Sequence, residues 1–264
     1  MLDNSSYTVF CHKDDFIDKA AKIFNEFGFV ILKKSTQISN LVSLKEDIDK
    51  AIKGKKIKEP IRNIHYFENG EVSSAHNLSS YIPSYDNFRQ TNFFKKFVEK
   101  AFGSVSNMDF NSSYFAKPKK IGIETKPHQD NAFFCMKPPE IATFWFPLSF
   151  ASVKNGALYY YPLSHQLGDI DHAAEGNLGA SMCLNYRQIS RIEKKFNRYY
   201  IDLKAGDCVV HNSQIVHGSE ENTSNYDRNA LNFSLASQKA QRDIVLYSNY
   251  QKKLENFIRV KKGC

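Results

Sequence analysis

The chain has 264 residues and carries 36 lysines and arginines against 28 aspartates and glutamates, a formal net charge of +8 at pH 7. This length suffices for a sizeable hydrophobic core, and a composition that is 42% hydrophobic and 14% aromatic excludes a disordered, collagen-like or low-complexity chain. No apolar run approaches the roughly 20 residues that span a bilayer, and the first residues lack the pattern of a signal peptide.

Helical spacing of apolar residues predicts a first helix over 16–27, which Gly28 ends, and a buried strand over 29–32 follows. Further helices are expected over 39–52 and 86–102, the second with Asp86 as its N-cap and Gly103 after its end. Short aromatic and β-branched runs then predict strands near 109–116, 121–134, 141–150, 156–161, 199–203, 207–216 and 228–237. With a last helix near 247–260, the pattern predicts one mainly β domain, a sandwich or barrel with flanking helices.

Basic residues gather at 53–58, 117–126 and 252–262. The first and third clusters lie on expected helices and alternate with acidic or apolar residues, which favours solvated helix faces over a nucleic-acid surface. No nucleic-acid-binding motif accompanies them, so we expect no nucleic-acid partner. Five scattered cysteines without a CxxC pair indicate reduced thiols, a cytoplasmic location and no thiolate zinc cluster.

His128 and Asp130 are the first candidates for chemistry. In a strand, side chains two residues apart project from the same face, so this imidazole and carboxylate can reach one ion. Alone the pair is a weak signal, because ordinary composition often produces it by chance. An exposed pair on a strand surface is the alternative.

A second segment, residues 206–219, leads through an apolar strand to His217, and Arg228 follows eleven residues later. A hairpin of this shape can place Arg228 beside His217. Two histidines and one carboxylate on one face of an octahedral ion are typical of non-haem Fe(II) oxygenases and leave three positions open. Those positions suit a bidentate 2-oxo acid and O₂, and arginine offers the fork that a distal carboxylate needs.

His211 competes with His217 for the ligand role, because six residues separate the two and an unbroken strand would face both the same way. The glycine and serine after His217, and the spacing to Arg228, favour His217. His211 is then expected to be a hydrogen-bonded histidine in the core or at the rim. The other histidines without a partner at useful spacing are expected on the surface: His12, His65, His76 and His172.

Five segments occur in the order that one enzyme family shows: FGFVI at 27–31, KP at 117–118, PHQDN at 127–131 with Trp145 after it, NGAL through PLSH at 155–165, and the block from Gly206 to HGS at 217–219 with Arg228. Together they resemble the phytanoyl-CoA dioxygenase family of Fe(II)/2-oxoglutarate-dependent oxygenases. The resemblance implies a double-stranded β-helix core (jelly roll, cupin-like) over about 105–240. An N-terminal helical jacket over about 1–104 and a C-terminal helix over about 245–262 would complete a single domain over 1–264.

The resemblance also implies roles for individual residues. His128, Asp130 and His217 would bind Fe(II), and Arg228 with Ser219 would hold the far carboxylate of the cosubstrate 2-oxoglutarate. Asn111 lies where many relatives have a glutamine that touches the cosubstrate; asparagine is shorter.

Two positions depart from the family pattern: Pro127 replaces a tryptophan and Leu163 replaces a glycine. Both changes could reshape the pocket, but neither removes a ligand. Asp130 is present, so the halogenase variation, which replaces this carboxylate by a small residue, is not indicated.

The resemblance implies a hydroxylase that converts 2-oxoglutarate and O₂ to succinate and CO₂ while it oxidises a small-molecule substrate. Two alternatives stay open: a hydrolase or isomerase that holds Zn²⁺ or Mn²⁺ on a similar barrel, and a basic, non-enzymatic binding module. Asn131 and Phe133 are candidates to line the substrate pocket, and Arg89 could reach an anionic substrate unless it forms a salt bridge. Lysines around the metal strand predict a small anionic metabolite.

Overall fold

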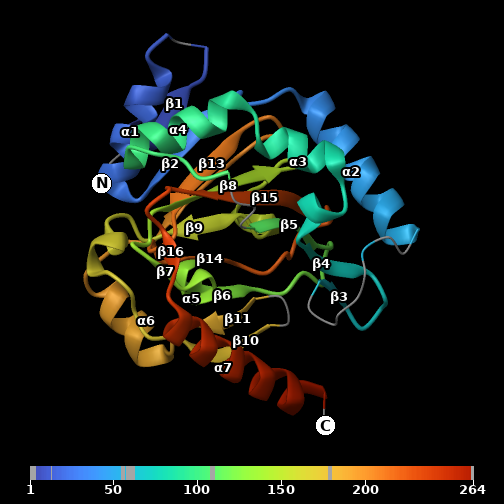
Figure 1. The fold of residues 1–264 in the computed structure, drawn as a ribbon. Helices are drawn as coiled ribbons and strands as arrows, with labels where there is room; N and C mark the ends of the chain where they lie inside the picture. The colour runs from blue at the N-terminus through green and yellow to red at the C-terminus, as the bar shows by residue number, and fades with distance from the viewer. Residues whose placement is uncertain are drawn as a thin grey trace.

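Strands that are apolar on one face and more polar on the other build two main sheets in this protein (Figure 1). The structure is a computed structural model that describes residues 4–12, 14–54, 57, 63–107, 111–177 and 180–262. The larger sheet has eight strands in the spatial order β1 (Thr8–Phe10), β2 (Phe29–Lys33), β13 (Cys208–Asn212), β8 (Ile141–Pro147), β15 (Arg228–Ala236), β5 (Asn111–Lys117), β4 (Val72–His76) and β3 (Ile64–Tyr66). Only β1 and β2 pair in parallel; the other neighbours are antiparallel.

The smaller sheet has four strands in the order β12 (Tyr199–Tyr200), β9 (Leu158–Tyr160), β14 (His217–Ser219) and β6 (Thr125–His128). Two further antiparallel pairs join β10 (Ala173–Asn177) to β11 (Ala180–Cys183) and β7 (Met136–Lys137) to β16 (Gln241–Arg242). The chain passes between the two main sheets, as in a double-stranded β-helix. The predicted jelly-roll fold is therefore confirmed.

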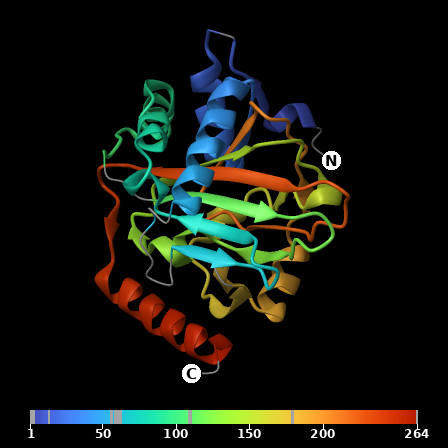
Figure 2. The same ribbon diagram turned by 90° about the vertical axis from the view of Figure 1, so that its right-hand side faces the viewer.

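Seven α-helices lie within the described residues: α1 (Phe16–Phe27), α2 (Ile38–Lys53), α3 (Pro83–Arg89), α4 (Asn92–Phe102), α5 (Asn131–Phe134), α6 (Tyr186–Glu193) and α7 (Ile244–Lys262). Four short 3₁₀ helices connect other elements: η1 (Asn4–Tyr7), η2 (Leu78–Ser80), η3 (Val153–Asn155) and η4 (Ser164–Leu167). Helices α1 to α4 lie over one side of the large sheet, whereas α6 and α7 lie at the opposite end of the molecule (Figure 2). No helix among the described residues is long and apolar enough to cross a membrane.

The two faces of the large sheet have different roles. On β15, Leu231 and Phe233 pack with aromatic residues of β8 and of α4 in the helix-covered core. Because strand side chains alternate, Asn232 and Ser234 project from the other, inner face. The inner face meets the small sheet where Phe29 stacks on Tyr160, with ring centroids 4.6 Å apart. The inner face therefore carries the polar side chains that two facing sheets can surround.

Several boundaries differ from those expected from sequence. The helix expected over 86–102 is two helices, and Asp86 lies inside α3, whose first turn begins at Pro83. The strand expected over 121–134 is the short β6 followed by the helical turn α5. The run over 207–216 ends as β13 at Asn212, after which the chain crosses to β14 in the other sheet.

The N-terminal jacket is not purely helical, because β1 to β4 all join the large sheet. Residues 109–110 of an expected strand, Lys55, Lys56 and Lys58 of the first basic cluster, and Cys264 lie outside the described residues. The described cysteines are all free thiols: Cys11, Cys135, Cys183 and Cys208.

Candidate metal and cosubstrate site

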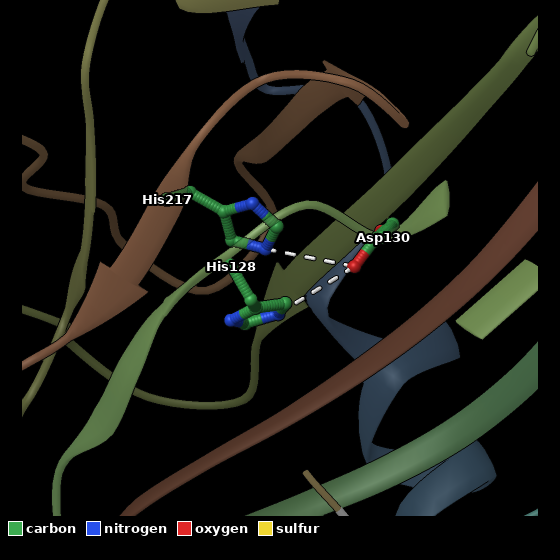
Figure 3. Close-up of side chains that lie close together, drawn as sticks. All are labelled: His128, Asp130 and His217. Carbon is green, nitrogen blue, oxygen red and sulfur yellow. Dashed lines mark ion pairs between the residues drawn. The ribbon is translucent and has the colours of Figure 1, made fainter. Parts of the chain in front are cut away.

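Two neighbouring strands of the small sheet bring three potential metal ligands together. His128 ends β6, Asp130 follows it, and His217 begins β14, where it pairs directly with His128 across the antiparallel ladder. One ligand atom of each lies within 4.8 Å of the other two. Figure 3 shows both imidazoles pointing toward the Asp130 carboxylate. The strand register thus assembles the three residues that sequence spacing had proposed as ligands.

Backbone carbonyls fix the tautomer of both histidines. Nδ1 of His128 lies 2.9 Å from the Lys126 carbonyl oxygen, and Nδ1 of His217 lies 3.1 Å from that of Ile215. A carbonyl oxygen only accepts, so Nδ1 carries a proton in both rings and Nε2 is the nitrogen left to bind a metal. Both Nε2 atoms lie 3.7 Å from Oδ1 of Asp130. This is the tautomer in which imidazole binds a metal.

The charge states suit a divalent cation. Burial, and then the neighbouring imidazoles of His128 and His211, lower the pKa of His217 well below its usual value, so this ring stays neutral. Burial opposes ionisation of Asp130, yet the surrounding imidazoles hold the pKa of its carboxyl well below the usual range. An anionic carboxylate and two imidazoles that converge on one point form the two-histidine, one-carboxylate donor set that Fe(II) accepts.

The second oxygen of Asp130 is held separately. His211 Nε2 donates to Oδ2 at 3.0 Å, and Thr143 Oγ1 donates to the same atom at 2.8 Å. His211 Nδ1 lies 3.0 Å from the hydroxyl of Tyr160, and Thr143 Oγ1 lies 2.9 Å from that of Ser234. His211 is therefore buried and hydrogen-bonded, as expected from sequence. Its contact with Asp130, and the roles of Thr143 and Tyr160, could not be read from spacing.

Two buried basic side chains, Arg228 and Lys117, lie side by side on the inner face. Arg228 on β15 pairs in register with Lys117 on β5, and Arg228 is only 2% exposed. Arg228 Nε donates to the Gly156 carbonyl at 3.1 Å, and its guanidinium lies 5.5 Å from the Trp145 ring centre. Among the described residues, no carboxylate forms an ion pair with either cation. Since buried charges are normally paired, this corner suits an anion.

Lys117 connects Arg228 to Ser219. Its Nζ donates to the backbone oxygens of Glu220 and, at 3.4 Å, Ser219. Burial, and then the charge of Arg228, lower the pKa of Lys117 well below its usual value. A bound dianion would relieve this repulsion. Gly156 makes the arrangement possible, because at its φ of +80° a β-carbon would lie 2.8 Å from Lys117 Cδ.

Asn111 lies on the inner face of β5, where it pairs with Ser234. Its side-chain oxygen accepts a hydrogen bond from the Ser113 hydroxyl at 3.0 Å. Ser234 in turn contacts Thr143 beside Asp130. Asn111 therefore belongs to the wall that runs toward the metal site, which is compatible with the cosubstrate contact expected from the resemblance.

The three residues expected at the substrate have different positions. The Phe133 ring lies edge-on to His128 with centroids 5.6 Å apart and close to Tyr250 of α7, so it lies beside the metal site. Asn131 is buried, and its amide donates to Asp169 Oδ1 at 2.9 Å and to the Met136 carbonyl at 3.2 Å. Both amide hydrogens are thus used internally, so the Asn131 side chain has no free donor for a substrate.

Arg89 is also misplaced for substrate binding. It is 4% exposed and forms an ion pair with Asp86 of the same helix at 2.6 Å. Neighbouring Phe88 packs against Phe146 and Phe233 on the helix-covered side of the large sheet. Arg89 therefore lies on the face opposite the metal site, and the salt-bridge alternative is correct.

His172, expected on the surface, is 3% exposed. Its Nε2 accepts the backbone N–H of Gln129 at 2.9 Å, and the Gln129 side chain ties the same turn to Gly168 and Gln214. His172 and Gln129 therefore fix the segment between the two ligands His128 and Asp130. His12 is exposed, whereas His65 and His76 are half-buried on the inner face.

The fold and site define a class: a cupin-like jelly roll with a two-histidine, one-carboxylate centre. The chain belongs to the phytanoyl-CoA dioxygenase (PhyH) family, whose sequence profile matches residues 24–230. It is 28% identical over 156 residues to a phytanoyl-CoA dioxygenase of Arabidopsis thaliana, covering 59% of this chain and 53% of that one. A match to phytanoyl-CoA dioxygenase 1 of Oryza sativa is 32% identical over 120 residues, covering 46% and 41%. The matched region spans about half the length of these relatives.

Solved structures share the fold. The non-heme alpha ketoglutarate dependent carbocyclase SnoK from nogalamycin biosynthesis superposes with a TM-score of 0.70 at 18% identity, covering 85% of each chain. EctD from S. alaskensis, solved with 2-oxoglutarate and 5-hydroxyectoine, superposes with a TM-score of 0.70 at 14% identity, covering 89% of this chain and 81% of that one. At this identity the likeness establishes the fold.

Proposed function

We propose that this protein is an Fe(II)- and 2-oxoglutarate-dependent oxygenase that hydroxylates a C–H bond of a small molecule. The observation that carries the proposal is the convergence of the imidazoles of His128 and His217 on the anionic Asp130. This donor set suits Fe(II) and leaves coordination positions for a 2-oxo acid and O₂. Membership of the PhyH family and the likeness to EctD, solved with bound Fe and with 2-oxoglutarate, support the same assignment.

Iron with 2-oxoglutarate and O₂ would supply the oxidising power, with succinate and CO₂ as co-products. The protein's own residues would bind and orient. The two terminal guanidinium nitrogens of Arg228 would donate hydrogen bonds to the far carboxylate of the cosubstrate, and the Ser219 hydroxyl would donate to the same group. Lys117 would add charge behind them, and the Phe133 ring would keep water from the side of His128.

Two alternatives differ from this proposal at the buried cations. A hydrolase or isomerase with Zn²⁺ or Mn²⁺ would use the same triad but would have no dicarboxylate for Arg228 and Lys117 to neutralise. A non-enzymatic binding module would not need two imidazoles held in the metal-binding tautomer. Structural neighbours include a carbocyclase and an epimerase, so product analysis must decide whether the outcome here is hydroxylation.

Anaerobic addition of Fe(II) and 2-oxoglutarate tests the proposal directly. We expect the visible charge-transfer absorption of an iron chelate with a 2-oxo acid, followed on admission of O₂ by succinate formation. Asp130→Ala and His128→Ala should abolish both signals, while His12→Ala, at an exposed histidine, serves as the matched control. Absence of the absorption and of succinate in the wild-type protein would refute the proposal, above all if Zn²⁺ or Mn²⁺ supported hydrolysis instead.

Two of the lysines that predicted an anionic substrate have other partners. Lys117 is buried against Arg228, and Lys126 donates to the Glu175 carbonyl at 3.1 Å. Of the lysines in this cluster, Lys119 and Lys120 remain exposed, so the prediction of an anionic substrate now rests on these two. We further infer that the chain works as one domain and without nucleic acid, which nucleic-acid binding assays would check. The free thiols favour a cytoplasmic location, which cell fractionation would check.

A further inference from the structure

Asn232 on β15 has a buried side-chain oxygen that no described neighbour satisfies. The residue is 9% exposed, and its side-chain oxygen is buried without a hydrogen-bond partner. Its side-chain nitrogen likewise makes no hydrogen bond with the described residues. Since Leu231 and Phe233 point into the helix-covered core, the Asn232 amide projects from the inner face. Buried polar groups are nearly always paired in native proteins, so an unpaired amide oxygen at this place points to a ligand that donates a hydrogen bond to it.

The strand register places Asn232 between the metal site and the buried cations. Across β8 it pairs with Trp145, the ring that lies beneath the Arg228 guanidinium. Two residues further along the same face is Ser234, whose hydroxyl contacts Thr143 beside Asp130. Residues two apart on a strand are about 7 Å from each other. Asn232 therefore lies close both to Arg228, at the cation end of the proposed cosubstrate site, and to the residues beside Asp130, at the metal end.

Neighbouring side chains already have partners of their own. Ser113, which pairs with Asn232 across β5, donates to Asn111 and accepts from His76 Nδ1 at 2.9 Å. His76 Nε2 accepts from Ser74 at 3.0 Å. Burial, and then the nearby His65, lower the pKa of His76 to about 3, so this wall is neutral at physiological pH.

The unpaired oxygen of Asn232 can be satisfied only by a group that donates a hydrogen bond. 2-Oxoglutarate at neutral pH has only hydrogen-bond acceptors, as ionised carboxylates do. It can accept from the Asn232 nitrogen, but it has no hydrogen to donate to the oxygen. 2-Oxoglutarate therefore leaves the Asn232 oxygen unpaired, whereas a donor group of the primary substrate would pair it. A hydroxyl or carboxamide, which both donates and accepts, complements the whole amide.

We propose that Asn232 recognises the primary substrate by hydrogen bonding a neutral hydroxyl or carboxamide group. This inference rests on the proposed function, since it assigns 2-oxoglutarate to the neighbouring positions. Asn232 is then a specificity residue: it selects compounds that present a donor at this point of the inner face. Loss of one such buried hydrogen bond weakens binding about ten- to hundredfold.

The experiment uses the full chain loaded with Co(II) and 2-oxoglutarate, and matched pairs of probes: uridine with deoxyuridine, mannitol with deoxymannitol, and nicotinamide with 3-acetylpyridine. Binding is measured as a shift in melting temperature and by calorimetry. In the wild-type protein, we expect a hydroxyl- or carboxamide-bearing member to bind about ten- to hundredfold more tightly than its partner. In Asn232→Leu the two members should bind equally, while Asn232→Asp, which keeps an acceptor, should retain part of the preference.

A structural role for Asn232 predicts a different result. If the amide served the fold alone, Asn232→Leu would lower the melting temperature of the unliganded protein, whereas our inference predicts an unchanged or higher value, because an unpaired buried amide is removed. Equal binding within every pair in the wild-type protein, or an undiminished preference in Asn232→Leu, would overturn the inference. The charge-transfer absorption of Fe(II) with 2-oxoglutarate, recorded without any probe, reports separately on the proposed function.

Discussion

His211 Nε2 donates to Oδ2 of Asp130 at 3.0 Å, while the other oxygen, Oδ1, faces the two imidazoles of the metal site. A carboxylate with one oxygen fixed can present the second in one direction. Because the Tyr160 hydroxyl lies 3.0 Å from His211 Nδ1, the ring itself is oriented from behind. His211 is therefore a positioning residue that orients the carboxylate of Asp130.

His211→Leu should weaken metal binding about 10- to 100-fold, since second-layer partners of metal ligands typically contribute that much. Titration with Co(II), followed by its visible absorption, measures the affinity. Tyr160→Phe removes only the hydroxyl that contacts His211 and should have a smaller effect in the same direction. A folded His211→Leu protein with wild-type Co(II) affinity and an unchanged Co(II) spectrum would contradict the positioning role.

Arg228→Lys should raise the KM for 2-oxoglutarate about 10- to 100-fold and change kcat less, because lysine keeps the charge but lacks the planar fork. Succinate formation at varied 2-oxoglutarate gives both constants. Lys119→Ala, at an exposed lysine of the same basic cluster, is the control for charge alone and should leave the KM unchanged. Equal effects of the two substitutions would indicate general electrostatic attraction instead of a specific contact.

Leu163, where the family has glycine, adopts a left-handed conformation with φ of +72°. A β-carbon there costs about 1 kcal/mol or more. The Leu163→Gly variant should therefore be more stable than the Leu163→Ala variant, with a free energy of unfolding higher by about 1 kcal/mol in urea denaturation. The alanine variant is the matched control, because both changes remove the leucine side chain and only one removes the β-carbon. An alanine variant as stable as the glycine variant would show that this turn is unstrained.

Burial lowers the pKa of His172 from 6.5 to about 4, although a hydrogen bond to the Ile170 carbonyl opposes the shift. Below pH 6.5 the unfolded chain takes up a proton that the folded chain refuses, so stability falls as the pH drops from 6.5 to 4. The loss from this group is at most about 3 kcal/mol. Urea denaturation of the metal-free protein across this range, compared with His172→Gln, should show a shallower fall for the variant. Parallel curves would mean that His172 titrates normally.

The metal ligands could be predicted from sequence because their information is local. His128 and Asp130 are two residues apart, and His217 is marked by its distance to Arg228. Thr143 and Tyr160 carry no such mark, since only the register of β8 with β13 and of β9 with β14 brings them to the site. Lys117 was visible only as part of a basic cluster, and its burial beside Arg228 depends on the pairing of β5 with β15.

The strand expected over 207–216 had the wrong end, because the chain changes sheet inside a stretch that begins and ends with apolar residues. The stretch from Cys208 to Val216 is continuous enough to suggest one strand, yet Asn212 accepts the Gln214 backbone N–H at 2.8 Å and turns the chain. Such side-chain turns are a known property of asparagine. The break between α3 and α4 at Gln90 and Thr91 is similar, since apolar spacing continues across it.

β2 shields β13 by antiparallel pairing along its length, from Cys208 opposite Leu32 to His211 opposite Phe29. Without the chain up to Lys33, the strand that carries His211 would become an open edge with unpaired N–H and C=O groups. Open edges recruit strands from other molecules. A fragment trimmed to residues 105–240 would keep every metal ligand and still self-associate. A piece for expression or fusion must therefore include β2 to keep β13 covered.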